Sequence, residues 1–133
     1  MVEIILSIRP EWLKKIFAGL KIIELRKSAP KCRCPFRVYF YETKQGRGSV
    51  VGECVCYCAE RAEPIEFSSL TAGSYLSVEE IIQYAGKRSV YAWYVANPEQ
   101  YDTLRPLSDL GLSRAPQSWC YAKHKLHSGE VTA

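Results

Sequence analysis

Six β-prone segments follow one another along this chain of 133 residues, and only two segments carry the signals of a helix. A parallel α/β sheet needs a crossover helix between successive strands, so two short helices are too few for that architecture. We therefore expect a mainly β structure of the α+β class, a small and mostly antiparallel barrel with short helices at its ends. The six segments are residues 2–8, 21–27, 36–43, 49–60, 90–95 and 117–125.

Local signals predict both helices. Pro10 suits the first position of a helix because its missing N–H would find no partner there, and Gly19 marks the end. Ser77 and Glu80 fit a capping box that begins a second helix, which we expect to end near Gly86. The first helix carries one apolar stripe, made of Trp12, Leu13, Ile16 and Phe17.

The composition is that of an ordinary globular domain. Hydrophobic residues make up 47% of the chain and charged residues 24%, which excludes disorder, collagen and coiled coil. A chain of this size buries roughly two thirds of the surface that its unfolded form exposes, so it can form a core without disulfides or metal. We expect a single domain over residues 1–133, with its core at residues 4–125 and a flexible C-terminal tail at residues 126–133.

Six cysteines would suggest a disulfide framework in a secreted protein, but no targeting signal is visible. The N-terminus has no basic segment, and the longest uninterrupted apolar stretch, residues 90–96, is far shorter than the roughly 18 residues that cross a bilayer. We therefore expect a soluble cytoplasmic protein with reduced thiols and no membrane association.

Cysteine spacing favours core filling over disulfides or metal. Three thiols alternate along one predicted strand, at Cys54, Cys56 and Cys58. Neighbours on one strand face lie about 6.6 Å apart, the far limit of disulfide geometry. A zinc site could combine Cys32 and Cys34 with His124 and His127, but zinc loops usually place about two to four residues between cysteines. Cysteine catalysis lacks a partner motif. We expect buried thiols, no metal and no cofactor.

The charge is unevenly distributed along the chain. Residues 1–50 carry eleven Lys or Arg against four Asp or Glu, a balance of +7, whereas residues 51–133 carry seven against ten, a balance of −3. The first part of the chain is therefore the more favourable surface for an anionic partner such as nucleic acid.

Residues 21–27 concentrate charge on one predicted strand. Lys21 and Lys27 fall on one face, with Glu24 and Arg26 on the other. Such a strand is better suited to line a site than to fill a core, although an exposed edge strand has the same pattern. Arg26 offers a planar fork of donors for a phosphate or a base edge, and Glu24 can accept from an exocyclic amine. The alternative is a surface ion pair between Glu24 and Arg26 that contributes little energy.

Aromatic residues could supply a stacking surface for bases. Nine Tyr, four Phe and three Trp are present, and most of these rings are expected to fill the barrel interior. Tyr41 and Trp119 are the two that we expect to be exposed beside Arg26, where a ring would stack on a base.

Several motifs in a fixed order carry a family resemblance. The most informative is Gly-x-Lys-x-x-Glu-x-Arg at Gly19, Lys21, Glu24 and Arg26. The others are Val-Tyr-Phe-Tyr-Glu-Thr at residues 38–43, Val-Gly-Glu at 51–53 and Pro-Gln-Ser-Trp-Cys-Tyr at 116–121. Over residues 4–123 the chain resembles the ASCH family, named after a transcription coactivator, the activating signal cointegrator. The resemblance implies a PUA-like barrel, the fold used by RNA-modification proteins.

The resemblance also implies two hydrolytic activities. Some ASCH relatives remove the acetyl group from acetylcytidine with a Lys, a Thr and a Glu. The Lys corresponds to Lys21, but Glu24 stands at the Thr position. The third position falls on Ser74, with Glu79 and Glu80 a turn or more away. Two of the three positions therefore differ. Lys21 and Glu24 could still support another hydrolysis by general acid–base catalysis, and ribonuclease activity is also associated with the family.

We predict a cleft that binds RNA or a modified nucleotide or nucleoside, between the first helix, the 21–27 strand and the 116–121 segment. The expected binding residues are Arg9, Lys21, Glu24, Arg26, Lys27, Tyr41, Gln117, Ser118 and Trp119. One alternative is a hydrolase acting on an acylated nucleoside or RNA, with Lys21 and Glu24 as its catalytic residues. Another is an interaction module whose basic face docks an acidic protein.

Overall fold

Strands dominate the computed structural model, which describes residues 1–43 and 46–127. The strands are β1 (Glu3–Ile8), β2 (Ile23–Arg26), β3 (Phe36–Glu42), β4 (Val50–Ala62), β5 (Val90–Arg105) and β6 (Trp119–Tyr121). The α-helices are α1 (Pro10–Phe17), α2 (Thr71–Ser74) and α3 (Val78–Ala85), and the 3-10 helices are η1 (Pro64–Leu70) and η2 (Leu107–Leu110).

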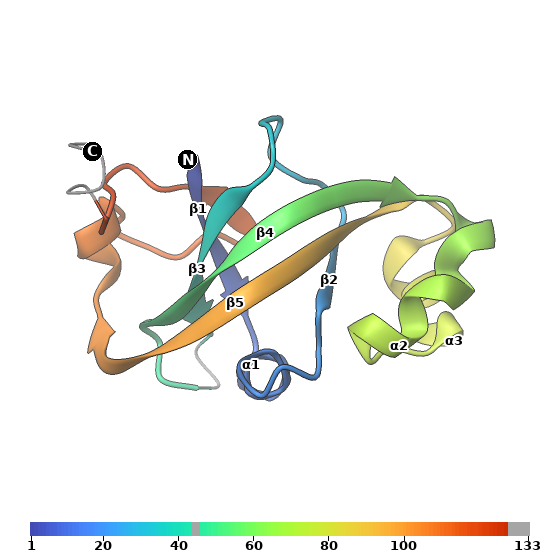
Figure 1. Ribbon diagram of the computed structural model, residues 1–133, viewed down its shortest axis with the longest axis horizontal. Helices are drawn as coiled ribbons and strands as arrows, with labels where there is room; N and C mark the ends of the chain where they lie inside the picture. The colour runs from blue at the N-terminus through green and yellow to red at the C-terminus, as the bar shows by residue number, and fades with distance from the viewer. Residues whose placement is uncertain (44–45, 128–133) are drawn as a thin grey trace.

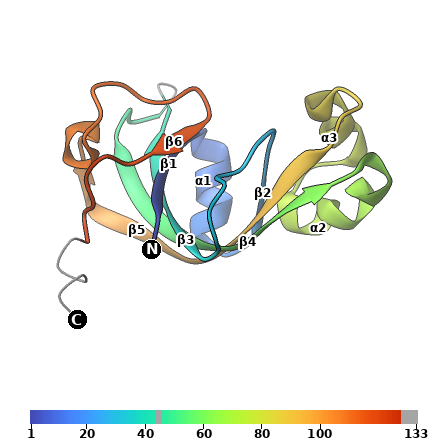
Figure 2. The same cartoon turned by 90° about the horizontal axis from the view of Figure 1, so that it is seen from above.

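The strands form one sheet in the order β2-β5-β4-β3-β1-β6, curled into a half-barrel (Figures 1 and 2). This confirms the expected mainly β, mostly antiparallel architecture, with two differences. Strands β1 and β3 pair in parallel, and the barrel stays open between the edge strands β2 and β6. The parallel pair could not be foreseen because β1 and β3 are joined across α1 and β2, and no local motif selects partners at that distance.

Both predicted helices lie where their signals place them. Helix α1 begins at Pro10 and is followed by Gly19, which has a left-handed φ of 77°. Before α3, the Ser77 hydroxyl accepts from the backbone N–H of Glu80 at 3.1 Å, and the Glu80 carboxylate accepts from the backbone N–H of Ser77 at 2.9 Å. Gly86 ends α3 with a φ of 62°. Because these capping interactions are local in sequence, the sequence alone predicted them.

All six strands differ by at least one residue from their predicted boundaries, and β2, β5 and β6 differ most. Strand β2 is shorter than residues 21–27 because the backbone N–H of Lys21 bonds to the Lys15 carbonyl, at 3.1 Å, next to the end of α1. Lys21 therefore leaves the strand alternation, and its side chain lies beside Glu24 instead of on the opposite face as predicted. Strand β5 extends past residues 90–95 because it pairs along the length of β4, and β6 is shorter than residues 117–125.

The buried apolar side chains form three clusters on the sheet. The largest packs α1 within the curl of the sheet, where Leu13 and Ile16 contact residues of β1, β3 and β4 (Figure 2). Gly52 on β4 permits this close approach, because a Cβ there would lie 2.6 Å from the Phe17 ring. The second cluster joins β2 and β5 to η1 and α3, and the third joins β1 and β3 to η2 and the C-terminal segment.

The six cysteines are free thiols with different exposure. Cys54 and Cys56 are buried in the largest cluster, which confirms their predicted role in the core. Cys32, Cys58 and Cys120 are half-buried and Cys34 is exposed, so the predicted full burial does not extend to these four.

The predicted C-terminal tail begins in contact with the sheet. Leu126 packs against the third cluster, and His127 Nε2 lies 2.8 Å from Glu53 Oε1. The rest of that predicted tail, residues 128–133, lies outside the described residues. Among residues 1–43 and 46–127, no helix is long and apolar enough to cross a membrane.

Candidate functional site

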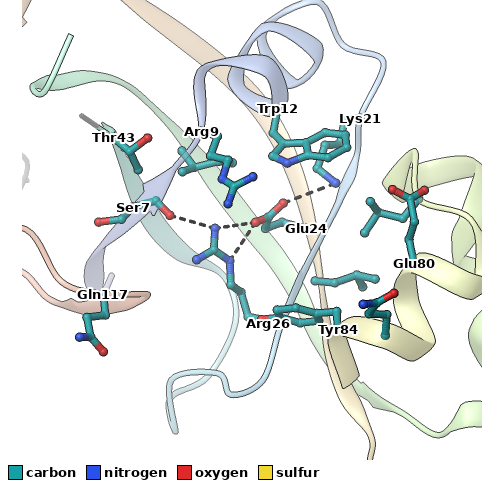
Figure 3. A pocket seen from close by; sticks show the side chains of 14 residues that line it. Ser7, Arg9, Trp12, Lys21, Glu24, Arg26, Thr43, Glu80, Tyr84 and Gln117 are labelled. Atoms are coloured by element: carbon teal, nitrogen blue, oxygen red, sulfur yellow. Dashed lines mark hydrogen bonds and ion pairs between the residues drawn. The ribbon is translucent and has the colours of Figure 1, made fainter. Parts of the chain in front are cut away.

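A cavity of about 580 Å³ lies where the half-barrel is open. Residues of β1, α1, β2 and α3 line it, together with Gln117 from the segment before β6 (Figure 3). We call this cavity the cleft. It lies between the three segments that the sequence predicted would enclose a binding site.

Glu24 lies at the bottom of the cleft with a buried carboxylate. Its Oε1 is 3.4 Å from Lys21 Nζ, and its Oε2 accepts from Arg26 Nε at 2.8 Å. A buried carboxylate needs such partners, because the desolvation of an unpaired charge would cost several kcal/mol (about 3–5 in measured cases). The alternative of an exposed surface ion pair between Glu24 and Arg26 does not hold, because the two side chains belong to a buried unit of three with Lys21.

Lys21 is placed in the cleft by the turn that follows α1. Only 2% of the residue is exposed, and its ammonium donates to the Ser74 carbonyl oxygen at 2.6 Å and lies 5.0 Å from the centre of the Trp12 ring. Burial lowers the pKa of Lys21 below its ordinary value, and the neighbouring Glu24 offsets part of that effect. Lys21 therefore gives up its proton more readily than a surface lysine does.

Arg26 connects both sides of the open barrel. Besides Glu24, its guanidinium donates to the Ser7 carbonyl oxygen on β1 at 2.9 Å (Figure 3) and to Ser118 Oγ at 3.2 Å. These contacts use most of its five N–H donors. Arg26 is therefore better placed to hold Glu24 and the cleft walls in position than to form a bidentate contact with a phosphate.

Arg9 is the exposed cation of the cleft. It precedes α1, and its guanidinium points toward the space between Trp12 and Glu24 (Figure 3). No carboxylate among residues 1–43 and 46–127 forms a salt bridge with it. An arginine without an internal partner keeps its planar donors available for an anionic ligand.

The aromatic rings at the cleft are Trp12 and Tyr84. Tyr41 and Trp119, the predicted stacking residues, are not among its lining residues. Tyr41 packs against the third cluster, and half-buried Trp119 donates from Nε1 to Ser28 Oγ at 3.0 Å. The sequence assigned Trp12 to the apolar stripe of α1. Its place at the edge of that stripe, next to Lys15 on the helix surface, was the available signal that one face of the ring is not packed in the core.

Of the remaining predicted site residues, one lines the cleft and the others lie outside its lining. Gln117 lines the cleft, whereas Ser118 bonds to Arg26 behind it. Lys27 lies outside the lining, with its ammonium 5.0 Å from the centre of the Tyr84 ring. Residues that line the cleft and were not predicted as site residues include Ser7, Thr43, Leu76, Glu80 and Gln83. Glu80 was recognised for its role in the capping box and as a neighbour of the third hydrolase position, but not as a site residue.

The zinc site considered and set aside in the sequence analysis, with Cys32, Cys34, His124 and His127 as ligands, is not formed among the described residues. His127 stacks on Tyr39, with ring centres 6.4 Å apart, and bonds to Glu53. Within the described part of the chain, no group of three or more His, Cys, Asp or Glu side chains is arranged to hold a metal ion.

The half-barrel and its cleft define a small domain with a PUA-like fold, and comparisons place it in a family. The model of the ASCH domain matches residues 6–105, so the chain belongs to the ASCH domain family. A search of the curated proteins found no significant match.

Solved structures of an ASCH protein from Zymomonas mobilis share the fold. That protein is 21% identical, with a TM-score of 0.78, and the match covers 98% of this chain and 91% of the other. A serine-to-alanine variant of it gives 21% identity and a TM-score of 0.79, over 91% of this chain and 88% of the other. A tyrosine-to-phenylalanine variant of the same protein gives 20% identity and a TM-score of 0.79, and the match covers 92% of this chain and 91% of the other.

Proposed function

We propose that the cleft binds a nucleotide of RNA or a modified nucleotide. The observation that carries this proposal is Glu24, a buried carboxylate flanked by cations at the bottom of a cleft lined by Trp12 and Tyr84. The volume of about 580 Å³ is within the range of small-molecule sites, roughly 300–1,000 Å³. It supports a single nucleotide as the ligand in preference to a strand bound along its length.

Each part of a nucleotide has a chemically suitable partner in the cleft. Glu24 can accept from an exocyclic amine, and Lys21 can donate to a base carbonyl. Arg9 is suited to the phosphate because its guanidinium has no internal carboxylate partner among the described residues. Trp12 and Tyr84 offer rings for stacking, which contributes about 1–3 kcal/mol per base.

Within this proposal, the predicted site residues take three roles. Arg9, Lys21, Glu24 and Gln117 contact the ligand directly. Arg26 and Ser118 act as positioning residues for Glu24. Lys27, Tyr41 and Trp119 make their observed contacts with other residues and support the fold around the cleft.

The binding test compares two arginines in the full chain. Arg9→Ala removes the proposed phosphate partner, whereas Arg61→Ala removes an exposed arginine paired with Glu63 outside the cleft. We expect Arg9→Ala to weaken binding of a short single-stranded RNA and of a nucleoside monophosphate roughly tenfold, or about 1.4 kcal/mol. It should also reduce the salt dependence of RNA binding by about one unit of log–log slope. Arg61→Ala should leave affinity unchanged.

Two results would contradict the binding proposal. One is that the unmodified protein has no detectable affinity for RNA and nucleotides, or binds them with an affinity that does not depend on salt. The other is an equal loss of affinity in Arg9→Ala and Arg61→Ala, because a general charge effect would then replace the cleft as the explanation.

A hydrolase is the second candidate, favoured by the pairing of Lys21 with Glu24. The lowered pKa of Lys21, caused first by burial, makes its amine available as a general base, and Glu24 lies 3.4 Å away. Incubation with acylated nucleosides and short RNAs tests this candidate. Turnover by the unmodified protein that Lys21→Met abolishes would support it. Turnover that survives Lys21→Met excludes Lys21 as the catalytic group.

A further inference from the structure

Thr43 lines the cleft and carries a polar atom that the contacts described so far do not use. Its side-chain oxygen Oγ1 is buried and has no hydrogen-bond partner within residues 1–43 and 46–127. A buried hydroxyl without a partner is unfavourable in the free protein, because it has lost its hydrogen bonds to water and gained none in return. At the wall of a cleft, such an atom is a candidate for a contact with the ligand.

Strand pairing places Thr43 beside Arg9. The parallel register of β1 and β3 ends with Ile8 opposite Glu42. Arg9 and Thr43 are the next residues on the two segments. The backbone N–H of Thr43 donates to the Ile8 carbonyl oxygen at 3.1 Å, and Arg9 keeps an extended backbone with a φ of −75° and a ψ of 150°. Residues opposite each other on neighbouring extended segments project their side chains to the same side, and these two both line the cleft.

The carboxylates of the neighbouring segments do not serve as acceptors for this pair. Glu24 is engaged by its two cations, and Glu42 accepts from the backbone N–H of Arg47 at 2.6 Å and from its Nε at 2.9 Å. Among the residues that the structure describes, neither the Arg9 guanidinium nor the Thr43 hydroxyl has a carboxylate partner. Two donors that lack such a partner therefore lie side by side in the cleft wall.

A second hydroxyl in this part of the cleft has a different role. Ser7 Oγ donates to the Pro116 carbonyl oxygen at 2.7 Å, so its proton is already used within the protein. The proton of the Thr43 hydroxyl is not. Both side chains lie on the side of Arg9 that is away from Lys21 (Figure 3). The available hydroxyl and the available guanidinium are thus at the opposite end of the cleft from the lysine amine.

We propose that the Thr43 hydroxyl donates to the same ligand phosphate as Arg9, and that Thr43 thereby selects a nucleotide over the corresponding nucleoside. This inference rests on the proposed function, in which Glu24 contacts the base and Arg9 the phosphate. Phosphate oxygens accept hydrogen bonds and donate none in the ionised form, so they match two adjacent donors that lack an acceptor. The hydroxyl adds a directed hydrogen bond to the charge that the guanidinium supplies.

The hydroxyl can contact a ligand without movement of the backbone. Thr43 as a whole is half-buried, and rotation about its Cα–Cβ bond moves Oγ1 from one staggered position to another. Because Oγ1 has no hydrogen bond to the described residues, this rotation breaks none of them.

The test measures the binding of the common ribonucleosides and of their 5′-monophosphates to the full chain by isothermal titration calorimetry. Thr43→Val replaces the hydroxyl by a methyl group of similar shape. We expect it to weaken binding of the 5′-monophosphate about tenfold and to leave the affinity for the nucleoside unchanged. Thr43→Ser keeps the hydroxyl and should keep most of the affinity. Thr103→Val, a matched change at an exposed position of β5 outside the cleft lining, should alter neither affinity.

Two further measurements separate a phosphate contact from a role in the fold. If Arg9 and Thr43 hold one phosphate, Thr43→Val should lower the affinity for the 5′-monophosphate less in the Arg9→Ala background than in the unmodified protein. The melting temperature of the free protein should stay the same or rise in Thr43→Val, because the variant removes a hydroxyl that has no partner.

Three outcomes would overturn this inference and leave the proposed function in place. They are an unchanged affinity of Thr43→Val for the 5′-monophosphate, an equal loss of affinity for nucleoside and monophosphate, and a lower melting temperature of the free variant. The second would assign the hydroxyl to the sugar or the base, and the third would assign it to the fold. A fourth outcome, no detectable binding of either ligand by the unmodified protein, would overturn the proposed function and this inference with it.

Discussion

Glu24 lies between Lys21 and Arg26, with one carboxylate oxygen 3.4 Å from Lys21 Nζ and the other 2.8 Å from Arg26 Nε. Because both oxygens are engaged and the carboxylate is buried, the three side chains behave as one unit. Removing the middle charge leaves two cations facing each other with little access to water. The cleft therefore combines a stability requirement with its proposed binding chemistry.

Replacing Glu24 should destabilise the protein strongly. Glu24→Gln keeps the shape of the side chain but leaves Lys21 and Arg26 without a counter-charge, so we expect the free energy of unfolding to fall by about 3 kcal/mol. Urea denaturation measures the change. Glu63→Gln is the matched control, because Glu63 pairs with Arg61 at an exposed site and should lose less than about 1 kcal/mol. Equal losses in the two variants would contradict the buried-unit description.

The pH dependence of stability should reveal the titration of Lys21. Burial lowers the pKa of Lys21 below 10.5, so the folded protein releases this proton at lower pH than the unfolded chain. The contribution of Lys21 to the free energy of unfolding therefore increases as pH rises from the pKa of Lys21 in the folded protein toward 10.5.

Lys21→Met isolates that contribution. The free energy of unfolding of the unmodified protein, minus that of the variant, should increase as pH rises from neutral toward 10.5 in matched urea titrations. The subtraction removes the cysteines and tyrosines that titrate in the same range. A difference that stays constant or falls with pH would show that the pKa of Lys21 is not lowered.

A second buried group, the carboxylate of Glu53, should also contribute stability that increases as pH rises, but in the acid range. Burial alone would raise the pKa of Glu53, but hydrogen bonds from Tyr101, His127 and Arg37 lower it below 4.5 overall. This stability is present above pH 4.5 and is lost as pH falls through the folded pKa.

Glu53→Gln measures this second contribution. The variant should be about 2–4 kcal/mol less stable than the unmodified protein near neutral pH, because Arg37 loses a buried counter-charge. This difference in the free energy of unfolding should become smaller as both proteins are titrated below pH 4.5. A difference that grows toward acid pH would mean that the pKa of Glu53 is raised.

Local sequence signals predicted local structure, and the errors come from interactions between distant segments. Pro10 and the Ser77–Glu80 capping box set helix positions through neighbouring backbone groups, so both helices could be located. The parallel pairing of β1 with β3 and the full length of β5 depend on partners elsewhere in the chain.

At the candidate site, too, the local sequence pattern gave correct predictions and the contacts between distant segments gave the errors. The Gly-x-Lys-x-x-Glu-x-Arg pattern correctly brought Lys21, Glu24 and Arg26 together, but strict strand alternation put Lys21 on the wrong face. The prediction that Trp119 is an exposed ring beside Arg26 could not be checked from the sequence, because exposure depends on which segment covers which face. Ser28 and Trp93, far from Trp119 in sequence, fix that ring in the structure.

The most direct test of the nucleotide site is a titration followed by the indole N–H signals of the three tryptophans in a ¹⁵N-labelled sample. On addition of a nucleoside 5′-monophosphate, the account predicts a saturable shift of the Trp12 signal, with Trp93 and Trp119 little changed, and loss of that response in Arg9→Ala. No Trp12 shift at millimolar nucleotide, or a saturable shift confined to Trp119, would contradict the account.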